Sequence, residues 1–427
     1  MSKSHGKAFE LDPLLRDKVR LLGKLLGRTI EGHYGGDMLA RIEDIRKQAK
    51  KARQGDKAER DRLLAMLKTM PEDALLPVVR GFNQFLNLAN IAEQQHGISW
   101  RRDDAADDEV EQMFTGLLDR LQSKGITGID LSEQIAAANI ELVLTAHPTE
   151  ITRRTLIQKY DLITRLLQKR DDLREDHPQL ADIERRLETV IEEIWHTDEI
   201  RQVRPTAVDE AKWGFAVIEN SLWEAVPGLL RNLDKDLRAR GAGALPLTAA
   251  PVRFSSWMGG DRDGNPNVTS GVTREVLYLA RWMAADLFLR DIEQLGMQLS
   301  MSEATASVKK LAGDDAHEPY RECMHGLRER LLQTKTWAAA KAKGQECDLT
   351  PLQEEEELLQ PLLLCYDSLM AHGLDEIANA GLLDTIRRVA CFGLTLVRLD
   401  VRQESTRHAN VLAEICEYYG MGDYHQW

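Results

Sequence analysis

Several features of secreted and membrane proteins are missing from this sequence of 427 residues. No apolar run approaches the roughly 18 residues that span a bilayer, and the opening stretch MSKSHGKAFELDPLLRD has no apolar signal-peptide core. The five cysteines are scattered and form no CxxC pair, a pattern typical of reduced thiols in a cytosol. We therefore expect a cytoplasmic protein without a membrane partner.

Positive charge is outnumbered by negative charge. The sequence has 56 Lys and Arg residues against 69 Asp and Glu residues, which gives a formal net charge of −13. Such a chain repels a phosphate backbone at long range, so we expect no nucleic-acid partner. A local arginine cluster could still bind a small anion.

Apolar residues recur with helical periodicity over most of the chain, for example at Val19, Leu22, Leu26 and Ile30. A long amphipathic pattern at residues 161–199 has a predicted break at residues 176–178. Further helices are predicted at residues 213–237, 273–295 and 358–372. Surface loops are predicted at residues 100–108, 312–319 and 343–353. The acidic run at residues 354–357 is interpreted as a solvated helix start.

Three short segments between these helices have the composition of strands. They are residues 141–146 (ELVLTA), 251–257 (PVRFSSW) and 394–402 (LTLVRLDVR). Helical crossovers between them predict parallel pairing, and each strand runs into a polar loop. Functional loops at the carboxyl ends of strands are typical of a (β/α) barrel, but closing a barrel takes about eight strands. Either the sheet is therefore small and open, or this chain is part of a longer protein.

The first of these loops contains a histidine at a strand-to-helix corner. His147 precedes Pro148, which restrains it to an extended conformation, and Thr149 is a candidate helix N-cap. A positioned imidazole is a natural general base near neutral pH. The alternative is a structural histidine that caps the corner.

Two arginines follow in the first turn of the next predicted helix. Cations there oppose the helix dipole, so Arg153 and Arg154 indicate a nearby anion. The alternative is that they pair with Glu150 or another carboxylate.

The second loop, SSWMGGDRDGNPNVT, is rich in glycine and short polar residues. Glycines at 259, 260 and 264 permit positive φ and close backbone approach. A calcium loop is excluded because Pro266 and Val272 stand where glycine and glutamate are needed. The polar candidates for a site are Asp261, Arg262, Asp263 and Asn265. The alternative is a surface turn held by Asx-type hydrogen bonds, and Trp257 is either core or the apolar wall of a site.

The third segment, LVRLDVRQESTRH, carries charge on one face of a strand. Alternation places Arg398, Asp400 and Arg402 on one face and Leu399 and Val401 on the other. Two arginines around an aspartate could hold a phosphate or carboxylate, with Arg398 the deeper of the two and held by Asp400 or a neighbouring acid. The alternative is the solvated face of an edge strand.

Taken together, these segments resemble the phosphoenolpyruvate carboxylase family of the bacterial type. The resemblance also includes WHTDEIR, RPTAVDEAKWGFAVIENSLW, GFNQFLNLANIAEQQH and the closing YYGMGDYHQW. It extends from about residue 19 to residue 427, and several ordered motifs of this length are far more specific than a single glycine pattern.

The resemblance implies an enzyme that joins bicarbonate to phosphoenolpyruvate and gives oxaloacetate and phosphate. In this scheme His147 matches the catalytic base for carboxyphosphate, Trp257 packs on the substrate's methylene side, and Arg402 binds its phosphate. Arg153 and Arg154 match a pair linked in some members to activation by sugar phosphates.

Family chains are much longer than this one, so the resemblance also implies an N-terminal fragment. It implies an α-rich α/β fold in which residues 1–140 form a helical region and residues 141–427 begin a (β/α) barrel. The acidic ligands of the Mg²⁺ or Mn²⁺ cofactor belong to the second half, and we expect no metal ligand in this chain. The full enzyme is expected to be an allosteric homotetramer and this chain alone inactive. The alternative is a non-catalytic binding or regulatory paralogue.

Overall fold

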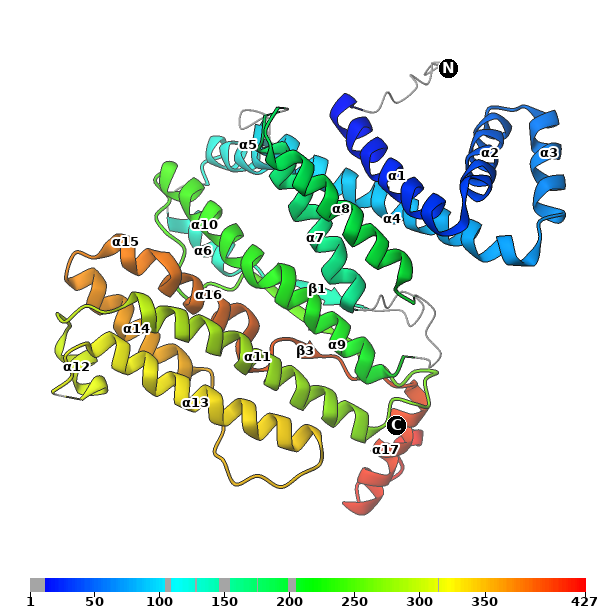
Figure 1. Cartoon of the computed structure of the whole chain (residues 1–427). Coiled ribbons are helices and arrows are strands. Elements are labelled where there is room, and N and C mark those ends of the chain that lie inside the picture. Colours follow the sequence, from blue (N-terminus) through cyan, green and yellow to red (C-terminus); the bar gives the residue numbers. More distant parts are fainter. Residues whose placement is uncertain are drawn as a thin grey trace. The chain divides into compact units, whose positions relative to one another are not determined.

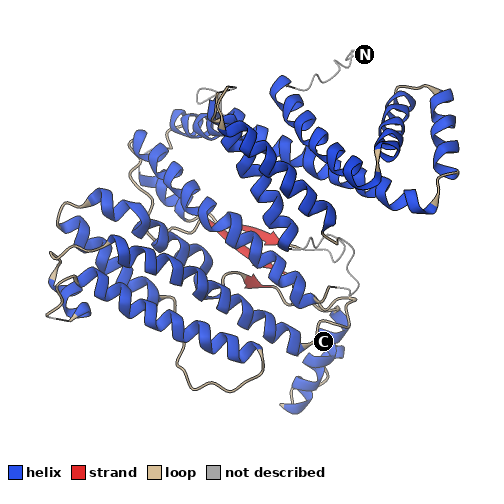
Figure 2. Ribbon diagram, in the orientation of Figure 1, coloured by secondary structure: helices blue, strands red, loops and turns tan. Residues whose placement is uncertain are grey.

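The computed structural model describes residues 12–103, 109–126, 129–145, 154–174, 176–198, 205–313 and 315–427. Helices make up most of this part, and three short strands form its sheet (Figures 1 and 2). Backbone contacts group the chain into two compact units, residues 1–114 with 152–202 and residues 115–151 with 203–427. The expected domain boundary at residue 140 is a family-based division that this grouping does not test, and it stays a prediction.

The first unit is helical throughout its described residues. Its helices are α1 (Pro13–Tyr34), α2 (Gly36–Arg53), α3 (Lys57–Lys68), α4 (Glu72–Asp103), α7 (Arg154–Asp171) and α8 (Gln179–His196), and α5 (Glu109–Ser123) crosses into the second unit. The periodic residues Leu22, Leu26 and Ile30 of α1 are buried in its core, where α1 packs against α4 and α8. The predicted break at residues 176–178 is confirmed, because α7 ends before it and α8 begins after it.

One loop prediction in this unit is wrong in part. Residues 100–108 were expected to leave the helical pattern, but α4 continues to Asp103. Polarity alone does not end a helix, since arginine is a good helix former and polar residues suit a solvated helix face. Residues 104–108 lie outside the described part of the chain.

Most of the second unit is also helical. Its elements besides the sheet are α6 (Ile129–Ala136), α9 (Ala207–Val217), the π-helical η1 (Ile218–Leu222), α10 (Trp223–Ala239), α11 (Ser270–Gln298), α12 (Ala306–Ala312), α13 (Pro319–Ala342), α14 (Glu356–Ala371), α15 (Asp375–Ile377), η2 (Ala378–Leu382), α16 (Leu383–Phe392), η3 (Gly393–Thr395), α17 (Ser405–Tyr418) and η4 (Tyr424–Gln426). The three helices predicted for this region are confirmed, although a π-helical turn interrupts the first. No helix in the described residues is long and apolar enough to cross a membrane.

Stacked aromatic rings connect the sheet to three helices of this unit. Phe254 of β2 (Val252–Ser256) stacks on Phe392 at a centroid distance of 5.2 Å, and Phe392 stacks on Trp223 at 5.1 Å. Phe288 of α11 meets the Trp223 ring edge-on at 4.9 Å. Offset and edge-to-face aromatic pairs of this kind add roughly 0.5–1.5 kcal/mol each beyond their buried area. The stack therefore gives β2 a rigid support.

The sheet has the order β1–β2–β3, and both pairings are parallel, as predicted. β1 (Ile140–Leu144) pairs over its full length with β2. The apolar side chains of β1 are not covered in this structure, because Ile140, Leu142 and Val143 are 54%, 48% and 42% exposed. The reason is positional: β1 lies at the edge of this three-stranded sheet, and its apolar side chains have no covering layer among the described residues.

The third strand is much shorter than predicted. β3 comprises only Arg398–Leu399, and the residues before it form a 3₁₀ turn. Leu396 then adopts φ +64°, a left-handed conformation that interrupts an extended chain. Such a conformation costs roughly 1–2 kcal/mol for a residue with a side chain. The Leu396 side chain is completely buried, and this burial offsets the cost.

Candidate functional site

The glycine-rich loop after β2 begins with a tight turn. The carbonyl oxygen of Trp257 accepts hydrogen bonds from the backbone N–H groups of Gly260 and Asp261, at 2.8 and 2.9 Å. Gly259 lies at φ +82°, and a Cβ there would stand 2.6 Å from Val276 in α11. Only glycine fits this position, because any side chain would be strained and would also overlap the helix.

This loop is joined to the segment after β3 by close backbone contacts. A Cβ on Gly260 would lie 2.1 Å from the carbonyl oxygen of Asp400. The Arg402 N–H donates to the Gly260 oxygen, and the Arg262 N–H donates to the Arg402 oxygen, both at 2.9 Å. Two of the three loops singled out in the sequence therefore meet at the carboxyl ends of β2 and β3.

Arg402 and Trp257 form the central side-chain contact at this junction. The guanidinium carbon of Arg402 lies 3.7 Å from the centroid of the Trp257 ring, which is a cation–π stacking distance. The indole Nε1 is buried and has no hydrogen-bond partner among the described residues. Trp257 is thus half-buried and stacked at a loop, so it serves as a wall of the site as well as a packing residue.

Arg262 is fixed by the start of α11. Its Nη2 donates to the Thr273 hydroxyl at 3.1 Å, and that hydroxyl donates to the Gly259 carbonyl at 2.8 Å. Its Nε is buried and has no hydrogen-bond partner in the described part of the chain. These contacts hold the guanidinium in one place, which suits a cation that recognises an anion.

Asp261, Asp263 and Asn265 shape the loop through local hydrogen bonds. The Asp261 carboxylate accepts from the Asp263 N–H at 3.2 Å, and the Asn265 side-chain oxygen accepts from the Asn267 N–H at 3.1 Å. These are the Asx-type contacts of a polar turn. The structure therefore gives Asp261 and Asn265 a structural task, whatever further role they have.

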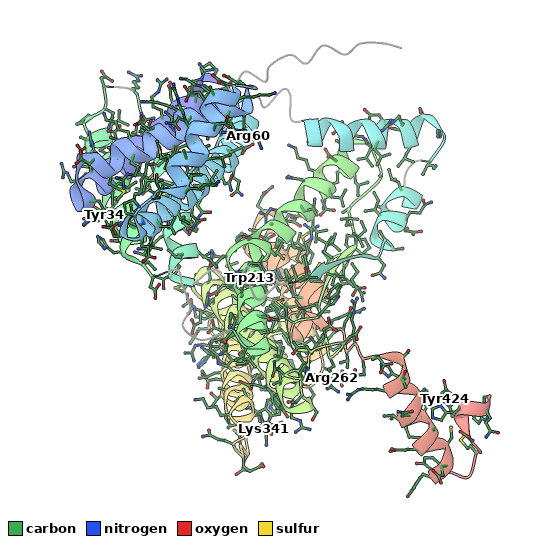
Figure 3. All side chains as sticks on the ribbon, turned by 90° about the vertical axis from the view of Figure 1, so that its right-hand side faces the viewer. Tyr34, Arg60, Trp213, Arg262, Lys341 and Tyr424 are labelled. Carbon is green, nitrogen blue, oxygen red and sulfur yellow. The ribbon has the colours of Figure 1, made fainter. Side chains whose placement is uncertain are left out.

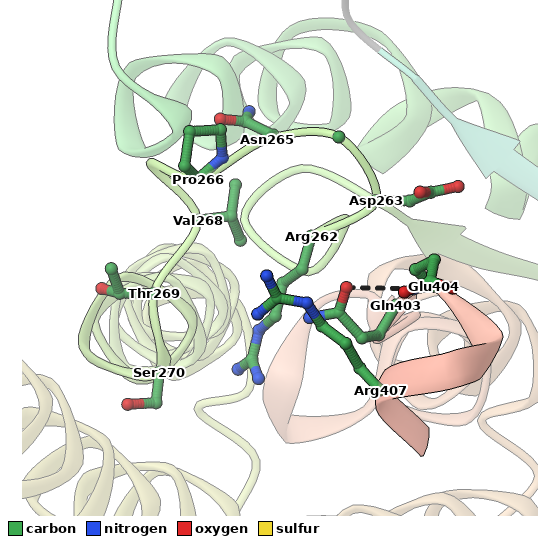
Figure 4. A pocket seen from close by; sticks show the side chains of 11 residues that line it. Arg262, Asp263, Asn265, Pro266, Val268, Thr269, Ser270, Gln403, Glu404 and Arg407 are labelled. Carbon is green, nitrogen blue, oxygen red and sulfur yellow. Dashed lines mark hydrogen bonds between the residues drawn. The ribbon is translucent and has the colours of Figure 1, made fainter. Parts of the chain in front are cut away.

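Two pockets flank the loop within the second unit. The larger, of about 720 Å³, contains Arg262, Thr269, Ser270, Gln403 and Arg407 in its wall (Figure 4). The smaller, of about 240 Å³, lies on the other part of the loop and is lined by Trp257, Asp261, Glu210 and Thr145. Asp263 and Asn265 border both pockets.

Arg407 is a pocket residue that the sequence reasoning missed. It lies in the first turn of α17, and Figure 4 shows its guanidinium and that of Arg262 in the same pocket. A signal was present, because a cation in the first turn of a helix opposes the helix dipole. Arg153 and Arg154 carry the same signal in the sequence.

Arg398 does not have the position expected for it. It is exposed, not deep in the sheet, and Val401 is also 53% exposed. The neighbouring acid is Glu355, whose pKa is raised mainly by burial, while Arg253 and Arg398 act in the opposite direction. The short length of β3 explains the difference, since the chain after Leu399 follows the glycine loop and leaves the plane of regular pairing.

Three candidates cannot be placed. His147 and Arg153 lie outside the described residues, and the side chain of Arg154, which begins α7, does too. Thr145, two residues before His147, lines the smaller pocket beside Trp257. The roles predicted for His147, Arg153 and Arg154 stay predictions.

Comparison with known proteins gives a consistent result. The family model for phosphoenolpyruvate carboxylase matches residues 15–427. The chain is 54% identical to the phosphoenolpyruvate carboxylase of Ectopseudomonas mendocina (strain ymp) over 98% of its own length and 48% of that protein. It is 53% identical to that of Pseudomonas aeruginosa (strain PAO1), with the same coverage of both chains, and 52% identical to that of Vibrio vulnificus (strain YJ016) over 97% and 47%. The chain thus spans about half the length of the curated relatives that it matches.

Proposed function

This chain belongs to the phosphoenolpyruvate carboxylase family, and from that membership we propose that it supplies part of an active site that carboxylates phosphoenolpyruvate. The products are oxaloacetate and phosphate. The observation that carries the proposal is the contact of Arg402 with Trp257, because it puts a fixed cation and an apolar ring at one point.

The proposed roles follow from the chemistry of these two groups. A guanidinium stacked on an indole keeps its N–H edges free, and these edges match the geometry of a phosphate. Trp257 also lines the smaller pocket, to which Arg402 does not contribute. The ring can therefore pack against the methylene carbon of the substrate while Arg402 holds its phosphate.

His147 is proposed as the base that removes the proton of carboxyphosphate. Bicarbonate oxygen attacks the phosphoryl group, the bond from phosphorus to the enolate oxygen breaks, and carboxyphosphate and the enolate of pyruvate form. Loss of the carboxyphosphate proton then releases CO₂ and phosphate, and the enolate carbon attacks CO₂. Support for His147 comes from Thr145, which precedes it by two residues in the sequence and lines the smaller pocket.

The divalent metal that this family generally uses does not fit the described residues of this site. Among the described residues, one group of three His, Cys, Asp or Glu side chains has converging ligand atoms, and it is His33, Glu192 and His196. None of these three lines either pocket. We therefore assign the metal no ligand at this site and derive no step through it.

The three parallel strands are proposed to be the first strands of a (β/α) barrel. Support comes from their parallel order, from the functional loops at their carboxyl ends and from the exposed apolar side chains of β1. A cytoplasmic homotetramer is the corresponding proposal for the assembly, and light scattering of a longer protein containing this chain tests it.

The experiment that tests the function joins this chain to the remaining part of the Ectopseudomonas relative, since the two are 54% identical over this region. We expect this protein to form oxaloacetate from phosphoenolpyruvate and bicarbonate, measured by coupled reduction to malate. The 427-residue chain alone is the matched control and should show no turnover. Failure of a folded joined protein to carboxylate, while it still binds phosphoenolpyruvate, would favour a non-catalytic binding protein instead.

A further inference from the structure

Two helices of the first unit end beside each other and bring together three metal-binding side chains. His33 is in the last turn of α1, and His196 is the last residue of α8. Their Nε2 atoms are 2.9 Å apart, and the Glu192 carboxylate lies 3.4 Å from Nε2 of His33. We propose that His33, Glu192 and His196 bind one divalent transition-metal ion of the zinc type. This site is independent of the proposed carboxylase chemistry.

The distances between the ligand atoms suit a tetrahedral ion. All three ligand atoms lie within 4.8 Å of one another. Zinc binds nitrogen and oxygen ligands at about 2.0–2.2 Å, which places neighbouring ligand atoms of a tetrahedron about 3.3 Å apart. The measured separations of 2.9 and 3.4 Å lie on either side of this value.

The orientation of the two imidazoles is also compatible with a shared metal ion. Their centroids are 4.3 Å apart and their planes are nearly perpendicular, at 81°. If the rings pointed straight at each other, the centroid distance would equal the 2.9 Å contact plus both ring radii, which is longer than observed. The rings are therefore inclined to the line between their Nε2 atoms, an arrangement compatible with two imidazoles that bind one ion.

The surroundings favour a positive ion at this place. Glu192 contributes a negative charge, and the carboxyl ends of α1 and α8 each carry the negative end of a helix dipole. The spacing of Glu192 and His196 on α8 puts both side chains on one face of that helix. Arg80 lies nearby, but it donates to the Thr197 carbonyl at 3.0 Å and lies over the Trp195 ring, so its own contacts hold it.

The ligand types select the ion. Imidazole nitrogens suit Zn²⁺, Ni²⁺ and Cu²⁺, whereas Mg²⁺ prefers oxygen ligands and an octahedral shell. Three protein ligands leave a fourth position for water.

The ion would connect the carboxyl end of α1 to α8, because His33 directly precedes Tyr34, the last residue of α1 (labelled in Figure 3). The consequence is a more stable first unit.

The test is a zinc titration of the whole 427-residue chain, stripped with a chelator and kept in excess Mg²⁺. We expect one Zn²⁺ per chain by calorimetry, with a dissociation constant below about 10 μM, and a higher melting temperature. His33→Gln and His196→Gln should each weaken zinc binding at least tenfold. His196→Cys should keep it, because a thiolate also binds zinc.

His325→Gln is the matched control. His325 is an exposed histidine that stands 3.9 Å from Glu322 and 4.0 Å from Glu329, and no ligand cluster in the described part of the chain includes it. Its loss should leave zinc binding unchanged. Co²⁺ in place of Zn²⁺ should give a tetrahedral visible spectrum that His33→Gln abolishes.

Equal zinc binding by the wild-type chain, the His33→Gln variant and the His196→Gln variant would overturn the proposal. So would an absence of stoichiometric zinc binding, which would leave the two rings as a simple hydrogen-bonded pair. Circular dichroism should show intact helices in each variant, because all three proposed ligands lie at the surface.

Discussion

The central carbon of the Arg402 guanidinium lies 3.7 Å from the centroid of the Trp257 ring. The two residues are far apart in the sequence, and the hydrogen bonds between Gly260, Arg262 and Arg402 bring their backbones together. The contact therefore depends on the fold of the loop, and substitutions on either side of it test the proposed substrate site.

Arg402→Ala should weaken phosphoenolpyruvate binding or turnover by two or more decades in the joined protein described above. The reason is that Arg402 is proposed to bind the substrate phosphate, and loss of one partner of a charge pair that substrate binding desolvates costs roughly 2–5 kcal/mol. Arg402→Lys should recover only part of this loss, because an ammonium supplies charge without the planar fork and stacks less well. The measurement is kcat/KM for phosphoenolpyruvate in each variant.

Arg398→Ala is the matched control for that series. Arg398 lies in the same segment and is exposed like Arg402, but among the described residues its guanidinium makes no cation–π contact with the Trp257 ring. It should change kcat/KM far less than Arg402→Ala. A larger catalytic loss at Arg398, or full recovery with lysine at position 402, contradicts the assigned roles.

His147→Asn should greatly slow oxaloacetate formation by the joined protein and spare phosphoenolpyruvate binding. Attack by bicarbonate precedes the step that His147 is proposed to serve, so phosphate release without carboxylation should persist. Parallel assays of phosphate and oxaloacetate measure the uncoupling. Near-normal oxaloacetate production by this variant would refute the role of base.

Gly260→Ala should disrupt the junction between the two loops. The new Cβ would stand 2.1 Å from the Asp400 carbonyl oxygen, and a backbone atom cannot rotate away as a flexible side chain does. Overpacking of this kind costs roughly 1–3 kcal/mol. We expect a lower melting temperature of the 427-residue chain and, in the joined protein, weaker substrate binding, since Arg402 is held by Gly260.

Gly326→Ala serves as the comparison. Gly326 lies in α13, and a Cβ there would meet nothing within 4 Å. Alanine should be neutral or stabilise the chain by up to about 1 kcal/mol, because glycine is a poor helix former. If both substitutions lower the melting temperature equally, the effect at Gly260 does not come from the close approach.

Glu357 should contribute to stability in a manner that depends on pH. Its carboxylate accepts from the N–H groups of Gln353 and Glu354 at 2.5 and 3.0 Å and pairs with Arg330. These contacts lower its pKa to about 2, with the backbone hydrogen bonds the largest cause. A lowered pKa means that the unfolded chain takes up the proton first as the pH falls. The contribution is therefore complete above pH 4.5 and is lost progressively toward pH 2.

Glu357→Gln should accordingly lower the urea midpoint at pH 7, and the gap to wild type should narrow at pH 3.5. We expect a loss on the order of 1 kcal/mol at pH 7, because the side chain is 32% exposed and solvent screens the ion pair. Glu346→Gln, which removes a fully exposed partner of Lys341, should change the midpoint little at either pH. A gap that stays constant with pH contradicts the proposed linkage.

The sequence alone determined most of the regular structure and the family. Helical periodicity located α1, α11 and α14, and the proline-containing break between α7 and α8 was visible as a local signal. The three strands and their parallel pairing followed from apolar segments between helices. These features depend on local propensity and on which face of an element is apolar, and both are encoded in neighbouring residues.

Only the tertiary structure decided the features that depend on contacts between distant segments. The acidic run is the solvated helix start that was predicted, because Glu354, Glu355 and Glu356 are exposed where α14 begins, but the ion pair of Glu357 with Arg330 of α13 depends on the tertiary structure. β3 is cut short at Leu396, whose left-handed conformation is supported by complete burial.

The same holds for the side-chain pairs on which the two proposals rest. Arg402 lies over Trp257 because Gly260 lets two backbones approach, and His33 meets His196 because two helices from distant parts of the chain end side by side. Sequence reasoning singled out Arg402 and Trp257 as site candidates but did not single out His33 or His196. Their partners could not be read from the sequence, because packing between segments far apart along the chain sets which atoms come within a few ångströms of each other.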